Sequence, residues 1–152
     1  MKVIVNVLVK QDNKCLMVQE NWGNVKGMWN FPAGHLDENE NIFDGAIREA
    51  KEETGYDVKL TGFLGVQNSI FDNRHIIHVL FTAEIIGGEI AYDPEEIMNV
   101  EFVDIDTLLN MTDDELRGGD SRRESLRKLK NNEVCPLSAV SNFEFRTNKF
   151  NK

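Results

Sequence analysis

Residues 42–54 constrain this chain most, because their apolar members recur at the 3.6-residue period of an α-helix. The predicted buried face of that helix consists of Phe43, Ala46, Ile47, Ala50 and Thr54. The neighbouring face carries Glu49, Glu52 and Glu53, whose carboxylates crowd one patch. Like charges at this spacing repel by roughly 0.2–0.5 kcal/mol per pair on an exposed helix. The patch is either a solvated acidic face, as in most Glu-rich helices, or a binding site for a divalent cation, because carboxylate oxygens suit Mg²⁺ and Mn²⁺.

Both ends of this helix carry recognisable signals. Asn41 is a suitable N-cap, and Asp44 places a negative charge in the first turn. Gly55 stands where the helix should end, since glycine adopts the left-handed conformation that closes many helices. Gly45 has no side chain, so a neighbouring loop or a ligand can approach the acidic side closely. The sequence therefore predicts a loop, a helix and a second loop, with the acids in the last turns of the helix.

The residues around the acids extend the pattern. Gly34 is followed by Glu40 and then by the run Arg48-Glu49-Ala50-Lys51-Glu52-Glu53-Thr54-Gly55-Tyr56. This stretch resembles the Nudix box, the signature of the MutT-like Nudix hydrolase superfamily, and every fixed identity of that signature is filled. The run Trp29-Asn30-Phe31-Pro32-Ala33-Gly34 resembles the strand and turn that precede the box in many Nudix enzymes, although the family usually has glycine where Ala33 stands. Glycine at position 34 permits a backbone geometry that other residues avoid, and such a turn can aim its carbonyls at a cation.

The resemblance implies an α/β fold, the Nudix αβα sandwich with a mixed β-sheet, over residues 2–110. It implies that Glu49, Glu52 and Glu53, together with the carbonyl of Gly34, bind Mg²⁺ or Mn²⁺ as the cofactor of a diphosphate-cleaving hydrolase. By the same resemblance, Arg48 does not bind metal but hydrogen-bonds the glutamates, a role that suits its fork geometry. Glu40 is expected to support the same site.

The base that accepts the proton of the attacking water stays open. It is either a box glutamate, with Glu49 first, or a loop acid, because in part of the family such an acid binds metal or activates water. Glu96 is the first loop candidate and Asp93 the second, and an ordinary solvated loop is the alternative. His35 belongs to a Pro-Ala-Gly-His-Leu run that resembles one phosphatase-like branch of the family. It either touches a phosphate or has a structural role in the loop.

The rest of the chain alternates predicted strands and short helices. Residues 2–10 and 15–19 are rich in branched apolar residues and should form a hairpin. Further strands are expected at 56–64, 65–70, 75–86 and 99–104. Helices are expected at 105–110, at 112–116 with Thr112 and Glu115 as a capping box, and at 121–130 with Asp120 as the cap. The last helix is basic, and it is either a solvated face or a grip for a distal phosphate of the substrate.

Length, composition and charge narrow the class of protein. A chain of 152 residues suits one globular domain, with 111–152 as a C-terminal helical extension packed on it. The net charge of −9 disfavours duplex nucleic acid as a partner but suits a small phosphorylated ligand bound through metal. No apolar run is long enough for a membrane span. Cys15 and Cys135 suit a reducing compartment, so a cytoplasmic location is expected. Dimers are common in the family, so the sequence leaves open whether the chain is a monomer or a homodimer.

The resemblance leaves the substrate open within one class. Members that cleave ADP-ribose typically carry a proline shortly after the box, where this chain has Phe71 or Asp72. The expected substrate is therefore a nucleoside di- or triphosphate, or a related nucleoside diphosphate derivative, cleaved by attack of water on phosphorus. One alternative is a non-catalytic Nudix-fold module that binds a nucleotide for regulation. A second is an isoprenoid-diphosphate isomerase, which shares the fold but needs a cysteine and glutamate pair that neither Cys15 nor Cys135 offers.

Overall fold

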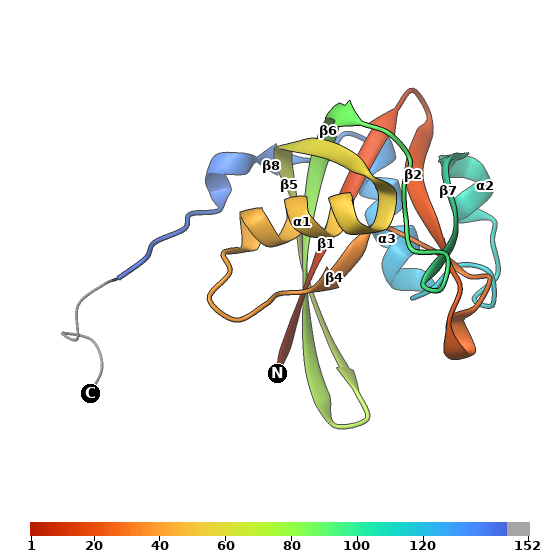
Figure 1. Ribbon diagram of the computed structural model, residues 1–152, viewed down its shortest axis with the longest axis horizontal. Coiled ribbons are helices and arrows are strands. Elements are labelled where there is room, and N and C mark those ends of the chain that lie inside the picture. The colour runs from red at the N-terminus through yellow and green to blue at the C-terminus, as the bar shows by residue number, and fades with distance from the viewer. Residues whose placement is uncertain (146–152) are drawn as a thin grey trace.

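The computed structural model describes residues 1–145, so residues 146–152 of the extension expected at 111–152 lie outside the described part. The strands are β1 (Lys2–Gln11), β2 (Lys14–Glu20), β3 (Trp29–Asn30), β4 (Ala33–His35), β5 (Tyr56–Phe71), β6 (Arg74–Gly88), β7 (Ile97–Asp104) and β8 (Cys135–Pro136). The helices are α1 (Ile42–Thr54), α2 (Ile105–Leu109) and α3 (Asp120–Lys130), with short 3₁₀ turns η1 (Gly23–Val25) and η2 (Leu137–Ala139). Figure 1 shows α1 lying across the front of the strands and α3 behind them.

The strands form one mixed sheet around β1. The order is β3-β2-β1-β6-β5-β8, with β4 paired to β1 and β7 paired to β2. β1 and β6 run parallel, whereas β1–β2, β5–β6 and β2–β7 run antiparallel. The predicted hairpin of the first two strands is confirmed by the pairing of Lys10 with Cys15. β1 therefore joins the part of the sheet that carries α1 to the part built from β2 and β7.

Side chains alternate along the central strands and divide the core into two hydrophobic clusters. Val5 and Phe81 belong to the cluster that contains Ala46 of α1. Leu80, the neighbour of Phe81 in β6, belongs to the cluster that contains Leu126 of α3. Because successive strand residues point to opposite faces, helices cover both faces of the sheet. The predicted αβα sandwich with a mixed sheet is confirmed. No helix among residues 1–145 is long and apolar enough to span a membrane.

Helix α1 has the predicted bounds and the predicted caps. The side chain of Asn41 accepts a hydrogen bond from the backbone of Asp44 at 2.9 Å. Gly55 is left-handed with φ 84°, and its N–H donates to the carbonyl of Lys51. These contacts satisfy backbone groups that the ends of a helix leave without partners. Local sequence signals therefore determine where this helix begins and ends.

The buried face of α1 is rotated toward its acidic side. Ile47, which was predicted to be buried, is 38% exposed, whereas Gly45 and Glu49 are buried. The cause is the loop before α1, which packs so closely that a side chain at Gly45 would lie 2.4 Å from Leu36 and 3.0 Å from Glu40. This loop covers one side of the helix, and it encloses Glu49 in the protein.

Two other sequence predictions are wrong. Residues 56–70 do not form two strands, because β5 is continuous and absorbs its irregularities as register shifts against β6 between Asp57 and Gly65. Residues 112–116 form a turn and not a helix, because the backbone there bridges to Trp29. The predicted contact between Thr112 and Glu115 is present all the same, since the Glu115 carboxylate accepts the Thr112 N–H at 3.2 Å.

Candidate active site

The candidate site lies where β4 meets α1. Gly34 of β4 pairs with Val5 of β1, which fixes β4 at the edge of the sheet. Helix α1 sets Glu49 directly against this strand, so closely that a side chain on Gly34 would lie 2.1 Å from the carboxyl carbon of Glu49. Glycine is thus required at position 34 for space. Its φ is not positive, so the conformational freedom that glycine permits is not used there.

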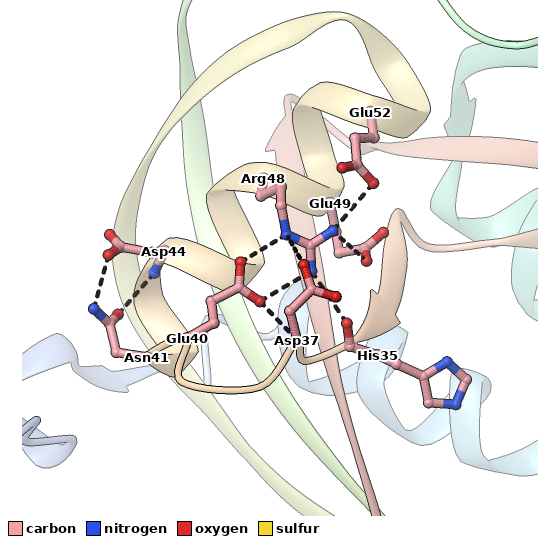
Figure 2. Close-up of polar contacts among 8 residues, drawn as sticks. All are labelled: His35, Asp37, Glu40, Asn41, Asp44, Arg48, Glu49 and Glu52. Atoms are coloured by element: carbon pink, nitrogen blue, oxygen red, sulfur yellow. Dashed lines mark hydrogen bonds and ion pairs between the residues drawn. The ribbon is translucent and has the colours of Figure 1, made fainter.

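Arg48 ties the acids of this region together, as Figure 2 shows. Its Nε and Nη2 donate to the two carboxylate oxygens of Glu40 at 2.6 and 3.0 Å. Its Nη1 donates to Glu49 at 2.9 Å and to Glu52 at 3.1 Å. Nη2 also donates to the backbone carbonyl of His35 at 3.1 Å. Its Nε also lies 3.4 Å from the Asp37 carboxylate. The guanidinium fork therefore holds two acids of α1 and two of the preceding loop in a fixed arrangement.

Arg48 and burial shift the pKa values of the carboxyl groups in opposite directions. The hydrogen bonds from Arg48 hold the pKa of Glu40 below its ordinary value. Glu49 is 9% exposed, and this burial raises its pKa in spite of Arg48. Glu53 accepts the N–H of Ala33 at 2.7 Å, and burial raises its pKa to about 8. Two of the three glutamates thus lie in surroundings that disfavour a negative charge, and a bound cation would relieve that cost.

The donor chemistry of this site fits a hard divalent cation. Glu49, Glu52 and Glu53 offer only oxygen atoms, the ligands that Mg²⁺ and Mn²⁺ prefer. Within residues 1–145, no three acidic, histidine or cysteine side chains already form a metal cluster. Glu49 and Glu52 face Arg48, whereas Glu53 faces the amide of Ala33. Each of these hydrogen bonds uses one carboxylate oxygen, so lone pairs for a cation are left on every glutamate.

Comparison with known proteins decides the family. The profile of the NUDIX domain matches residues 1–129. The chain belongs to the NUDIX domain family. The resemblance stated from the box residues is thereby confirmed.

Curated relatives and solved structures agree with this assignment. An ADP-ribose pyrophosphatase of Methanocaldococcus jannaschii is 33% identical over 108 residues, which are 70% of this chain and 63% of that protein. Nudix hydrolase 6 of Arabidopsis thaliana is 34% identical over 109 residues, or 68% of this chain and 38% of that protein. The chain thus spans less than two thirds of the length of these relatives. A solved NUDIX hydrolase from Nitrosomonas europaea has a TM-score of 0.79 at 21% identity, covering 93% of this chain and 97% of that one, and it shows the shared fold.

The loop that carries Asp93 and Glu96 lies beside the Nudix box. The backbone of Asn21, which follows β2, donates to the carbonyl of Glu96 at 2.9 Å. After burial, the causes of the raised pKa of Glu53 include the negative charge of Glu96. The structure therefore brings Glu96 towards the acids of α1. The Asp93 side chain instead accepts a backbone N–H within its own turn at 2.9 Å.

Sequence reasoning missed one buried acid of this region. Glu20, the last residue of β2, is 4% exposed, and its Oε1 accepts from Nη1 of Arg117 at 2.6 Å. Its Oε2 is buried without a hydrogen-bond partner among the described residues. Burial raises the pKa of Glu20, against the attraction of Arg117. No local signal marks this position, because a glutamate at the end of an apolar strand is usually exposed.

Arg122 of α3 is also buried, although a basic helix was predicted to be either solvated or a phosphate grip. It is 5% exposed, its Nε donates to Oδ1 of Asn30 at 2.8 Å, and its guanidinium lies 5.6 Å from the ring centre of Phe31. Burial lowers its pKa to about 10. Arg122 is therefore not part of a solvated face, and it packs against the strand that precedes the Nudix box. Asp120 does not cap α3 as predicted but binds Arg123 at 2.9 Å.

The imidazole of His35 points away from the Arg48 group, as Figure 2 shows, although its carbonyl binds Arg48. His35 and His78 pair with the same residue, Ile4, from opposite sides of β1. The two histidines therefore share one face of the sheet. Burial lowers the pKa of both, and that of His78 to about 4.

Proposed function

We propose that this Nudix domain is a metal-dependent pyrophosphohydrolase. It cleaves a diphosphate linkage in a nucleoside di- or triphosphate, or a related nucleoside diphosphate derivative, by attack of water on phosphorus. The observation that carries this proposal is the packing of the Glu49 carboxylate on Gly34 while Arg48 holds both Glu49 and Glu52. A helix selected only for stability would not keep three acids on one patch.

The proposed cofactor is Mg²⁺ or Mn²⁺, held by Glu49, Glu52 and Glu53 with the carbonyl of Gly34. When bound, such an ion neutralises charge on the diphosphate and activates water. The protein supplies the arrangement of ligands: β4 sets Gly34 against Glu49, and the Ala33 amide orients Glu53. In this scheme Arg48 is a positioning residue, because it contacts carboxylates and not the reacting atoms.

For the proton acceptor we propose Glu96 first, with Asp93 second among the loop acids and Glu49 as the alternative within the box. Glu96 is exposed on a loop whose backbone is held to Asn21, and its charge is among the causes that raise the pKa of Glu53. Asp93 is the weaker candidate, since its side chain is already engaged in its own turn. A positioned general base typically contributes about 10²- to 10⁴-fold to the rate.

The proposed substrate class rests on the residues that follow the Nudix box and on the names of the relatives. The relative from Methanocaldococcus jannaschii is named for ADP-ribose, whereas this chain lacks the proline typical of that activity and has Phe71 or Asp72 there. We therefore keep nucleoside diphosphate derivatives as the class, and a small molecule, not a nucleic acid duplex, as the partner. Cys15 and Cys135 are both free thiols, which supports the cytoplasmic location expected from the sequence.

The test is a Mg²⁺-dependent hydrolysis screen over nucleotides, nucleotide sugars and dinucleotides, followed by variants on the best substrate. Glu52→Gln and Glu53→Gln should each lower kcat by about 100-fold or more, because each removes a charged ligand worth several kcal/mol in the transition state. Glutamine at position 53 still accepts the Ala33 N–H, so circular dichroism should show an unchanged fold. Glu96→Gln tests the base in the same assay, and Glu84→Gln, an exposed acid of β6, is the matched control.

Full activity in both Glu52→Gln and Glu53→Gln would contradict the metal assignment. A wild-type protein that binds a nucleotide with Mg²⁺ but releases neither phosphate nor pyrophosphate from any member of the screen would contradict hydrolysis. That result would favour the alternative of a nucleotide-binding regulatory module.

A further inference from the structure

The arm formed by β5 and β6 has a long open edge. Figure 1 shows these two strands reaching past the other elements as a hairpin. On the outer side of β5, strand β8 covers only Gly62 and Phe63, and no other strand of residues 1–145 pairs with that side. The backbone N–H and C=O groups from Gly65 to Phe71 that face outward are therefore available to another strand.

This open edge lacks the usual protection. Proteins guard such edges with charged residues, proline or bulges, because an unguarded edge pairs with other chains. The run Gly-Val-Gln-Asn-Ser-Ile-Phe at 65–71 contains no charged residue and no proline. Its register against β6 is regular, since the last shift lies between Phe63 and Gly65. Three of its apolar side chains are exposed: Val66 by 56%, Ile70 by 66% and Phe71 by 68%.

We propose that this edge pairs with the same edge of a second copy of the chain, in an antiparallel, two-fold symmetric dimer centred on Asn68. In this register Asn68 lies opposite Asn68 of the second copy, and Val66 lies opposite Ile70 on either side. Val66 and Ile70 are four residues apart in one strand, so they point to the same face. The pairing thus joins two exposed apolar residues of each copy into cross-strand contacts, the unit of sheet stabilisation.

The ends of the edge are also complementary. The same register sets Phe71 opposite Gly65 of the second copy, where the absence of a side chain leaves room for the ring. The Nζ of Lys128 lies 3.9 Å from the place that a side-chain carbon on Gly65 would occupy. An ammonium group there meets the face of the incoming aromatic ring.

The choice of a second copy as the occupant follows from this self-complementarity. A two-fold axis requires that each residue find its partner in the same segment. The segment 65–71 meets that requirement with apolar, polar and aromatic–glycine pairs in one register. An edge of this length extends over about 24 Å, at about 3.4 Å per residue.

The first experiment measures the association of the full chain by sedimentation velocity over a range of concentrations. The wild type should form a dimer, and Ile70→Lys should raise the dimer Kd by about tenfold or more, because two lysines then enter each interface. Ile70 is exposed within one chain, so the substitution should not disturb the fold. Ile86→Lys is the matched control and should leave Kd unchanged, because this isoleucine is 64% exposed but lies near the end of β6 that is distant from residues 65–71.

The second experiment tests the register by disulfide cross-linking in a Cys135→Ser background. Residues directly opposite in an antiparallel pair have Cα atoms about 4.5–5.5 Å apart, which suits a disulfide. Asn68→Cys should therefore give a covalent dimer under mild oxidation. Ser69→Cys should not, because residue 69 lies opposite Gln67 of the second copy and not opposite itself.

A monomeric wild type at every concentration would overturn the proposal. So would a dimer that Ile70→Lys leaves intact, or one that Ile86→Lys disrupts equally. Cross-linking by Ser69→Cys in place of Asn68→Cys would overturn the register centred on Asn68.

Discussion

Arg48 sits between the loop and the helix of the Nudix box and contacts more of the candidate site than any other residue of Figure 2. Its side chain is 26% exposed, and it binds Glu40, Glu49 and Glu52 at once. Exposed ion pairs contribute little to stability, but a bidentate pair with a carboxylate that is mostly enclosed fixes geometry. We therefore propose that Arg48 sets the orientation of its partners.

Arg48→Lys separates charge from geometry, because lysine keeps the positive charge and loses the planar fork. We expect kcat to fall by about 10- to 100-fold with little change in KM, as is usual when the support of a metal ligand is lost. Steady-state kinetics at saturating Mg²⁺ provide the measurement, and thermal unfolding shows whether the fold is kept. Arg127→Lys on the exposed side of α3 is the control. A fully active Arg48→Lys would mean that charge alone suffices at this position.

At the scale of elements, Gly55 links α1 to the strand that follows. Its φ of 84° is left-handed, and a side chain there would lie 2.1 Å from the carbonyl oxygen of Glu89 and 2.4 Å from the nitrogen of Ala91. Gly27 has nearly the same φ, 87°, but nothing lies within 4 Å of its missing side chain. The two glycines thus share a positive φ and differ in crowding.

Gly27→Ala should cost about 1–2 kcal/mol of unfolding free energy, the strain of a left-handed alanine. Gly55→Ala should cost about 3 kcal/mol or more, because the same strain is joined by overlap with backbone atoms that cannot rotate away. Urea denaturation of both variants and the wild type gives the difference. Equal losses in the two variants would show that the segment around Glu89 moves aside without cost.

These elements also show what a sequence determines locally. The bounds of α1 follow from Asn41 and Gly55, because caps act within one turn of the helix and need no distant partner. Ile47 was misplaced because the covering loop, and not the periodicity, decides which side of the helix is buried. The segment 112–116 was misassigned for a similar reason, since its pairing with Trp29 outweighs its helical signals.

The residues of the candidate site likewise divide into those that the local sequence predicts and those that depend on distant partners. Glu49, Glu52, Glu53 and Arg48 lie in one short segment, so their spacing and the Nudix box point to them in advance. Glu20 was missed because its partner Arg117 stands 97 residues away. Arg122 was misread because the Asn30 side chain that it binds is 92 residues away. Such contacts arise only when the whole sheet has assembled, and nothing in the local sequence records them.

At the scale of the whole molecule, partly buried titratable groups on the two faces of the sheet respond to pH in opposite directions. Burial raises the pKa of Glu53 from 4.5 to about 8, so the folded state binds more protons than the unfolded state between these values, and stability falls as pH rises. Burial lowers the pKa of His78 from 6.5 to about 4. In that window the unfolded state binds more protons, so stability falls as pH falls. Between about 4.5 and 6.5 the two contributions oppose each other, and the profile of the wild type alone does not separate them.

His78→Gln isolates the histidine contribution. Glutamine cannot take up a proton in this range, and its side chain can still meet Nδ2 of Asn6, which lies 3.3 Å from Nδ1 of His78. We expect the wild type to lose stability relative to His78→Gln as pH falls from 6.5 towards 4. In this range the histidine is protonated in the unfolded state but not in the folded state, so a lower pH favours unfolding. Urea unfolding of both proteins at pH 7.5 and pH 5, in the presence of a chelator, gives the difference between them. NMR titration of the His78 ring provides an independent reading, with a midpoint well below 6.5. A stability difference that is the same at both pH values, or a ring that titrates near 6.5, would show that the α3 face of the sheet admits water to His78.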